Sequence, residues 1–260
     1  SLINILLVYP KVSETFWSFK HALRVIGRKA AFPPLGALTV AAMLPRNWNL
    51  RLVDLNAGPL RDEDLTWADY AFISAMIAQK DSTRQVIDRC RKLGVKTACG
   101  GPLFRSYRND FPDVDHLFLG EGEITVPRFV SDLRKGAPKS VYECQDHPSL
   151  DKTPIPRWDL IDLNDYSCMS VQYSRGCPFN CEFCDIIVMN GRIPRTKSNE
   201  QMHAELDALY DLGWRGSVFI VDDNFISNKA KVKSLLRAID VWQSSRKKRI
   251  TFFTEASVDL

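Results

Sequence analysis

The chain has 260 residues, of which 45% are hydrophobic and 25% are charged, and its formal net charge is +4 at pH 7. This composition is typical of a globular protein with one large or two ordinary domains, and it excludes a disordered or fibrous chain. The small net charge indicates no nucleic-acid partner, and no apolar run approaches the roughly 18 residues that a transmembrane segment needs.

Strand-like and helix-like segments alternate through the first half of the chain. Strands are expected at Ile3–Tyr9, Leu50–Leu55, Tyr70–Met76, Lys96–Cys99 and His116–Leu119. Helices are expected at Leu35–Leu44, which follows two prolines, at Ser82–Leu93, which Gly94 ends, and after the run Gly120-Glu-Gly-Glu123. The alternation predicts an α/β fold with a doubly wound, Rossmann-like parallel sheet over residues 1–136.

Residues 137–165 interrupt this pattern. Four prolines, at positions 138, 148, 154 and 156, break the segment, and no hydrophobic period survives. The segment is therefore expected to be a linker with packed anchors such as Trp158.

The alternation resumes over residues 166–260. Strands are expected at Ser170–Tyr173, Ser217–Val221 and Ile250–Thr254, with helices at Ser198–Leu212 and from about Asn228. The first of these helices begins with the capping-box pattern Ser198-x-x-Gln201. Three β/α units cannot close a barrel, because an edge strand would stay unpaired. We therefore expect the chain to be the N-terminal part of a longer protein.

Three of the seven cysteines lie close together, in the run Ser174-Arg-Gly-Cys-Pro-Phe-Asn-Cys-Glu-Phe-Cys-Asp185. An odd, clustered count favours metal ligation in a reducing compartment, here the cytoplasm, over disulfide bonds. Structural zinc sites and ferredoxin clusters take four ligands, so three thiolates indicate an iron–sulfur cluster with one open iron. The alternative is a zinc site completed by a distant residue, although the nearest histidine, His203, falls inside a predicted helix.

The spacing Cys-x₃-Cys-x-aromatic-Cys, with Phe183 as the aromatic residue, resembles the signature of the radical S-adenosylmethionine (SAM) enzymes. The resemblance implies a 4Fe–4S cluster on Cys177, Cys181 and Cys184, with SAM on the open iron. Reduction by an external donor such as flavodoxin or ferredoxin would then yield a 5′-deoxyadenosyl radical. It further implies that residues 166–260 form the first half of a partial (β/α) barrel. The SAM contacts that it indicates are Phe183, Asp222, Asp223, Asn224 and Glu255.

The first domain resembles the cobalamin-binding domain of the cobalamin-dependent radical SAM enzymes. Ligands of such sheets bind at the carboxyl ends of the strands, where glycines let the backbone approach a large flat ligand. The candidate cobalamin contacts at these ends are Tyr9, Asn56, Ser74, Met76, Gly100, Gly101, Gly120, Glu121 and Gly122. Asn56 replaces the histidine that ligates cobalt in the Asp-x-His-x-x-Gly element of other cobalamin proteins, so no protein histidine is expected on cobalt.

The segments Tyr9-Pro10, Glu14–Phe19 and Phe32–Gly36 resemble the branch of this class that includes the hopanoid C-methylases. That branch implies methylation of an unactivated carbon in a lipid-like small molecule, with cobalamin as the methyl carrier. The catalytic residues stay unassigned. Two alternatives are open. The first is a radical SAM cyclase, oxidoreductase or methylthiotransferase in which the first domain does not transfer methyl. The second is a non-catalytic metal- or corrinoid-binding module.

Overall fold

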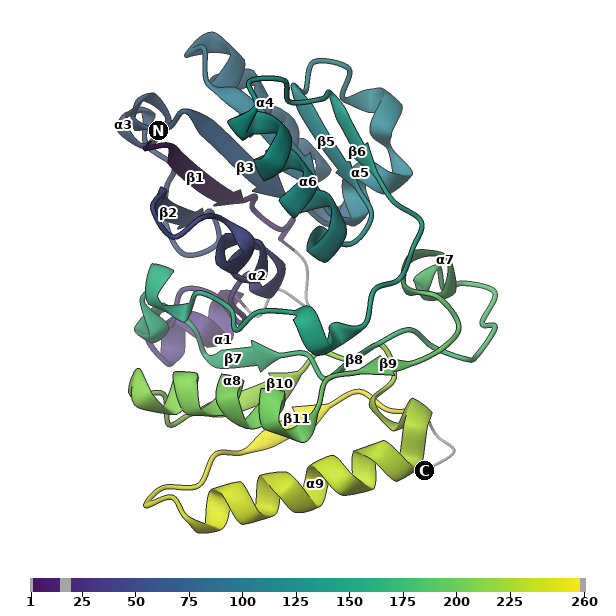
Figure 1. Cartoon of the computed structure of the whole chain (residues 1–260). Helices are drawn as coiled ribbons and strands as arrows, with labels where there is room; N and C mark the ends of the chain where they lie inside the picture. Colours follow the sequence, from purple (N-terminus) through teal and green to yellow (C-terminus); the bar gives the residue numbers. More distant parts are fainter. Residues whose placement is uncertain (1, 15–19, 258–260) are drawn as a thin grey trace.

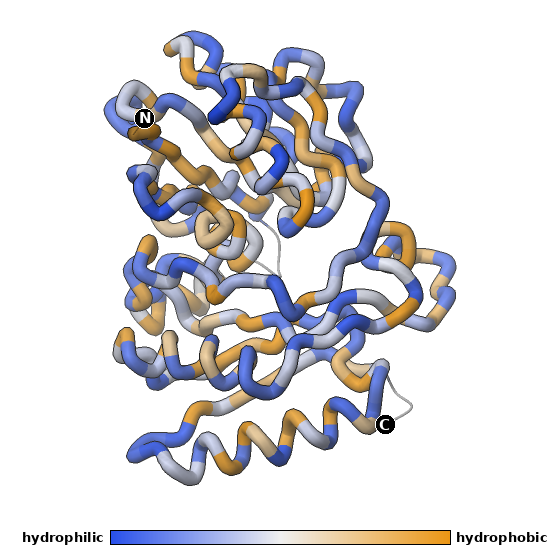
Figure 2. Tube along the Cα trace, viewed as in Figure 1, coloured by the Kyte–Doolittle hydropathy of each residue, from blue (hydrophilic) through white to orange (hydrophobic). Residues whose placement is uncertain are grey.

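A computed structural model of the chain describes residues 2–14 and 20–257 and shows two stacked α/β units (Figure 1). Residues 15–19, most of the Glu14–Phe19 segment, lie outside the described residues. Apolar residues follow the inner strands and the inward faces of the helices, and polar residues follow the outer loops (Figure 2). Within the described ranges, no helix combines the length and the apolar character needed to cross a membrane.

The N-terminal unit is built on a six-stranded parallel sheet. Its strands are β1 (Asn4–Tyr9), β2 (Asn49–Asp54), β3 (Tyr70–Ser74), β4 (Lys96–Gly100), β5 (His116–Leu119) and β6 (Val141–Glu143). Their order in the sheet is β2-β1-β3-β4-β5-β6, so the chain winds to one side of β1 and then to the other. This reversal leaves a crevice at the carboxyl ends of the strands on either side of it, β1 and β3.

Helices cover both faces of this sheet, which explains why β1, β3 and β5 are buried along most of their length. These helices are α2 (Leu35–Met43), α3 (Asp62–Trp67), α4 (Lys80–Lys92), α5 (Pro102–Ser106) and α6 (Gly122–Arg134), and α1 (Lys20–Val25) precedes them in the chain. Helices α2 and α6 pack on the face that carries Ile5 and Leu7, and α3, α4 and α5 pack on the face that carries Leu6 and Val8. The predicted fold class is confirmed.

Several short elements escaped the sequence-based prediction, among them α3 and β6. Helix α3 contributes only Leu65 to the core, and its six residues are too few to display a helical period. Strand β6 lies inside the segment 137–165 that we expected to be a linker, and it pairs in parallel with β5. The N-terminal sheet therefore extends to Glu143, because a three-residue strand shows no alternation that sequence inspection can detect.

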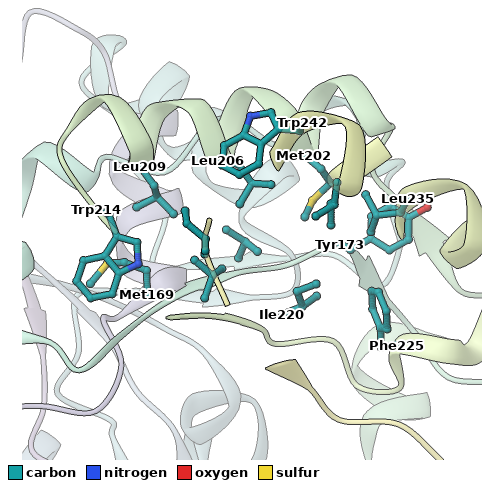
Figure 3. Packing of buried hydrophobic residues seen from close by; sticks show 14 of the residues in the cluster. Met169, Tyr173, Met202, Leu206, Leu209, Trp214, Ile220, Phe225, Leu235 and Trp242 are labelled. Atoms are coloured by element: carbon teal, nitrogen blue, oxygen red, sulfur yellow. The ribbon is translucent and has the colours of Figure 1, made fainter. Parts of the chain in front are cut away.

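The second unit has a three-stranded parallel sheet in the order β11-β10-β7 and a short antiparallel pair, β8 with β9. Its elements are β7 (Cys168–Val171), β8 (Ser174–Arg175), α7 (Ile186–Asn190), β9 (Arg195–Thr196), α8 (Asn199–Asp211), β10 (Ser217–Ile220), α9 (Lys229–Ser244) and β11 (Phe252–Thr254). Ser198 caps α8 in the predicted capping box. Met202, Leu206 and Leu209 of α8 pack with Leu235 of α9 against one face of the sheet (Figure 3). The opposite face points toward the N-terminal unit.

The connection between the units is packed into the second core. Trp158 and Tyr166 are each 2% exposed and share this core with Ala30 and Leu38 of the N-terminal half. The Tyr166 hydroxyl donates to Asp54 at the end of β2 over 3.0 Å. Burial raises the pKa of Asp54, and the Tyr166 hydrogen bond compensates part of the cost of its charge. The two sheets are thus held as neighbours by buried contacts.

Candidate functional site

A cavity of about 640 Å³ lies between the two units. The N-terminal sheet contributes the ends of β1, β3, β4 and β5, and the second unit contributes the free face of β7 and β10 together with α7. The volume is in the range of small-molecule and cofactor sites. The predicted residues that line it are Tyr9, Ser74, Met76, Gly100, Gly101, Gly120, Gly122 and Asp223.

The cavity continues as an apolar slot between the N-terminal sheet and its helices. Leu7, Phe72, Ala98 and Phe118 form the sheet side of the slot, and Val40 and Met43 of α2 are among the residues on its helix side. The small side chain of Ala98, in the middle of β4, keeps the slot open. Inspection of the strand ends alone did not detect these apolar lining residues.

Two predicted cobalamin contacts lie outside the cavity lining. The Asn56 amide donates to Asp54 Oδ1 over 2.7 Å and to the Pro10 carbonyl over 3.2 Å, and its oxygen accepts from the Val12 N–H over 2.9 Å. Asn56 therefore holds the loop after β1 against the end of β2. Glu121 forms ion pairs with the second unit.

The three polar residues after β10 have separate roles. Asp222 is 3% exposed and accepts from the Tyr173 N–H over 2.7 Å and from the Ser174 hydroxyl over 2.6 Å, so it joins β10 to the strand before the cysteine loop. Asn224 is buried and its amide donates to the Ser257 hydroxyl over 3.1 Å. Asp223 is the member of the trio that lines the cavity. It accepts from the Gly176 N–H over 3.2 Å and from the Asn190 amide over 3.0 Å.

The cysteine loop connects β8 to α7. Its first residue, Gly176, has a φ of +98°, and a Cβ there would lie 2.8 Å from the Ile193 carbonyl oxygen, so only glycine fits. The Cys177 N–H donates to the Gly191 carbonyl over 3.2 Å, which closes the loop at its base. A sharp, closed base of this kind fixes where the loop leaves the sheet.

The three thiols of the loop lie near the surface. Cys181 is exposed, and Cys177 and Cys184 are half-buried. Over the described residues, no three His, Cys, Asp or Glu side chains are gathered in an arrangement that could hold a metal ion. Phe183 is 91% exposed and Glu255 is exposed, so these two predicted SAM contacts also lie away from the cavity lining.

An ion-pair network connects the base of the cysteine loop to the N-terminal sheet. Arg175 of β8 binds Glu121 over 2.7 Å and Glu123 over 2.9 Å, and Arg195 of β9 binds Glu121 over 2.7 Å. These four side chains are between 4% and 15% exposed. Burial by itself would raise the pKa of Glu123, but the Arg175 guanidinium outweighs it and the pKa is lowered. The two strands that flank the cysteine loop, β8 and β9, are thereby fixed to the turn after β5.

A further arginine, Arg105 of α5, holds the far side of the loop. Its guanidinium donates to the Val188 carbonyl over 2.9 Å and to the Met189 carbonyl over 3.2 Å, at the end of α7. Sequence inspection missed Arg105, Arg175 and Arg195, because their partners lie 52 to 84 residues away in the chain. The Gly-Glu-Gly-Glu run was the available signal, since paired carboxylates after a strand require cationic partners when they are buried.

Replacing Glu121 tests the network. Glu121→Gln leaves the buried Arg195 without its carboxylate, and we expect the free energy of unfolding to fall by about 3 kcal/mol. The control is Glu143→Gln, because Glu143 is 52% exposed and lies 3.7 Å from Arg108. The control should lose less than about 1 kcal/mol. Equal losses in urea unfolding at pH 7 would contradict a network that joins the units.

Asp222 predicts a pH dependence of stability. Burial raises the pKa of its carboxyl from 3.8 to about 6. Between these values the folded protein holds a proton that the unfolded chain has released, so stability falls as the pH rises through about 6, by up to about 3 kcal/mol.

Comparison with Asp222→Asn isolates this effect from that of the other buried carboxyls, because asparagine does not titrate and can still accept a hydrogen bond. Urea unfolding of both proteins at pH 4.5 and pH 7.5 measures it. The wild type should lose stability relative to the variant at the higher pH, and an unchanged difference would contradict the assignment.

Comparison with known proteins gives matches along nearly the whole chain, although no protein-family model matches it. An uncharacterized methyltransferase of Synechocystis sp. is 49% identical over 257 residues, which cover 98% of this chain and 48% of the relative. The hopanoid C-2 methylase of Rhodopseudomonas palustris is 35% identical over an alignment of 262 residues, which covers 99% of this chain and 50% of the relative. The chain spans about half the length of these curated relatives.

Solved structures share the fold. The cobalamin-dependent S-adenosylmethionine radical enzyme OxsB, with aqua-cobalamin bound, aligns with a TM-score of 0.74 at 18% identity over 96% of this chain and 38% of its own. The radical S-adenosylmethionine methyltransferase TsrM from Kitasatospora setae aligns with a TM-score of 0.69 at 15% identity over 94% of this chain and 52% of its own. The chain is thus similar in sequence to the hopanoid methylases and in fold to cobalamin-dependent radical SAM enzymes, and the three-cysteine signature and the paired sheets agree with both.

Proposed function

We propose that this chain carries the cofactor-binding part of a radical SAM methyltransferase that uses cobalamin to methylate an unactivated carbon of a lipid-like small molecule. The observation that carries the proposal is the shared cavity, which brings the glycine-bearing strand ends of one unit next to the base of the cysteine loop of the other. The relative named hopanoid C-2 methylase supports the reaction type.

The residues of the N-terminal unit fit a large flat ligand such as cobalamin. Gly120 lines the cavity and has a φ of +141°, and a Cβ there would lie 2.4 Å from the Cys144 carbonyl oxygen, so this turn of the cavity wall requires glycine. Tyr9 and Ser74, at the ends of the two strands beside the crevice, would contact the ligand, and the apolar slot beside Ala98 would take an aromatic group of it. The Asn56 side chain is held by hydrogen bonds to Asp54, Pro10 and Val12, so this position would supply no ligand to cobalt.

The cysteine loop fits an iron–sulfur cluster in its donor chemistry. Thiolates are the ligands that such clusters select, and all three thiols come from one loop on a fixed base. Because the thiols are not gathered in the structure, loading the cluster requires the loop to rearrange. The exposure of Cys181 supports reduction by an external donor such as flavodoxin or ferredoxin.

Asp223 is positioned to contact SAM. Both of its hydrogen bonds to the loop region use Oδ2, and the carboxylate faces the cavity. A carboxylate beside the first residue of the cysteine loop suits the ammonium group of SAM. When bound, the cluster with SAM would supply radical chemistry and cobalamin would supply a methyl group, while this chain's residues orient the ligands and exclude water.

Reconstitution with iron and sulfide under anaerobic conditions tests the cluster. The wild type should show the absorption and, after reduction, the electron paramagnetic resonance signal of a 4Fe–4S cluster. Cys177→Ala, Cys181→Ala and Cys184→Ala should each lose both signals, and Cys144→Ala, outside the loop, should keep them. Binding of one zinc ion instead, without reductive cleavage of SAM, would contradict the proposal.

Titration with hydroxocobalamin tests the cavity. Ser74→Trp places a large side chain at the strand end beside the crevice, and we expect the affinity for hydroxocobalamin to fall by at least about tenfold, because the ring occupies the space of the ligand. The control is Ser106→Trp, because Ser106 is exposed at the end of α5 and does not line the cavity. Equal affinity of the two variants, measured by equilibrium dialysis, would place the ligand elsewhere.

A further inference from the structure

A row of three side chains crosses the second sheet on the face that points toward the N-terminal unit. The strand register pairs Ser170 of β7 with Phe219 of β10, and Phe219 with Phe253 of β11. The two phenylalanine rings stack, with centroids 4.9 Å apart and planes inclined by 7°. Ser170 and Phe219 line the cavity. The row therefore presents one hydroxyl group beside two aromatic rings.

The Ser170 hydroxyl has no hydrogen-bond partner among the described residues, although Ser170 is 2% exposed. A buried polar group without a partner costs about 1–3 kcal/mol, and such groups are rare in folded proteins. Other buried side-chain atoms in the described part of the chain also lack partners, but Ser170 is the residue among them that lines the cavity. The partner of this hydroxyl would therefore come from a molecule in the cavity.

Aromatic rings continue the wall beside Ser170. The ring of Phe32, from the N-terminal unit, lies 5.2 Å from that of Phe219 and 6.4 Å from that of Phe253. Phe32 is 38% exposed and Phe253 is 42% exposed. Covering exposed ring surface with an apolar group contributes about 25 cal/mol per Å². The wall therefore favours an apolar body, and Ser170 favours one polar atom on it.

The row lies further back along the strands than the residues that follow their carboxyl ends. Phe219 precedes Asp223 by four residues, and Ser170 precedes Ser174 by four residues. At about 3.3 Å per residue, the row lies on the order of 10 Å below the level of Asp223 and the cysteine loop. A molecule that reacts at the level of the loop would place its remote end on this row.

We propose that Ser170 and the rings of Phe32 and Phe219, with Phe253 stacked on Phe219, form a subsite for the remote end of the substrate. The subsite selects an apolar ring or chain that carries one hydrogen-bonding atom, and Ser170 is its specificity-determining residue. This inference rests on the proposed function, because it takes the same cavity to be the reaction chamber.

Two probes of matched size, 2-naphthol and 2-methylnaphthalene, test the subsite, because they differ by a hydroxyl in place of a methyl group. Their dissociation constants are measured by equilibrium dialysis with and without saturating hydroxocobalamin. The wild type should prefer 2-naphthol by about fivefold, the value of one hydrogen bond. Ser170→Ala should abolish this preference without weakening the binding of 2-methylnaphthalene. Phe32→Ala should weaken both probes alike, and Ser131→Ala, on the outer surface of α6, should change neither.

Three results would overturn the subsite. The preference for 2-naphthol could survive in Ser170→Ala, or the wild type could bind neither probe. Alternatively, Ser170→Ala could lower the affinity for hydroxocobalamin. The last result would assign the hydroxyl to cobalamin. If the wild type fails to bind hydroxocobalamin but its preference for 2-naphthol still depends on Ser170, the proposed function fails and the subsite stands.

Discussion

The buried ion pairs of Arg175 and Arg195 with Glu121 and Glu123 fix the strands that flank the cysteine loop to the N-terminal sheet. Removing a charge from water costs several kcal/mol, so each of these groups is stable in its place only with its partners. Two acidic residues at the start of α6 also meet the positive end of the helix dipole. The network therefore has one favourable arrangement, and this arrangement sets how the two sheets face each other across the cavity.

The same turn after β5 serves both sides of the cavity. Gly120 and Gly122 line the cavity, while Glu121 and Glu123 hold the strands that flank the cysteine loop. Arg105 holds the other side of the loop through the carbonyls at the end of α7. A ligand bound against these glycines would therefore lie beside the residues that hold the cysteine loop. The cysteines themselves need not contact the N-terminal sheet.

The fold was predictable from the sequence where the chain uses long repeating elements, and the functional residues were predictable where they form a local pattern. The strands β1 to β5 and the helix α8 were expected within two residues of their observed limits, because apolar runs and caps act over neighbouring residues. Strand β6 was missed because its stability comes from pairing with β5 and not from its own three residues. For the trio after β10, adjacent residues alternate in direction, so that Asp223 faces the cavity and Asp222 faces Tyr173 and Ser174.

The sequence by itself determined the α/β class, the two parallel sheets and the loop with three thiols, because periodicity, capping and ligand spacing are local properties of a chain. Only the tertiary structure decided that Asn56 is occupied in its own loop, that Arg175 and Arg195 join the loop to Glu121, and that Ser170 lies beside stacked rings without a partner. These relations connect residues on different strands and units, so each depends on strand order, register and burial. The count of three cysteines indicates an open ligand position, and the fold brings Arg175, at the base of their loop, to the lining of the cavity between the units.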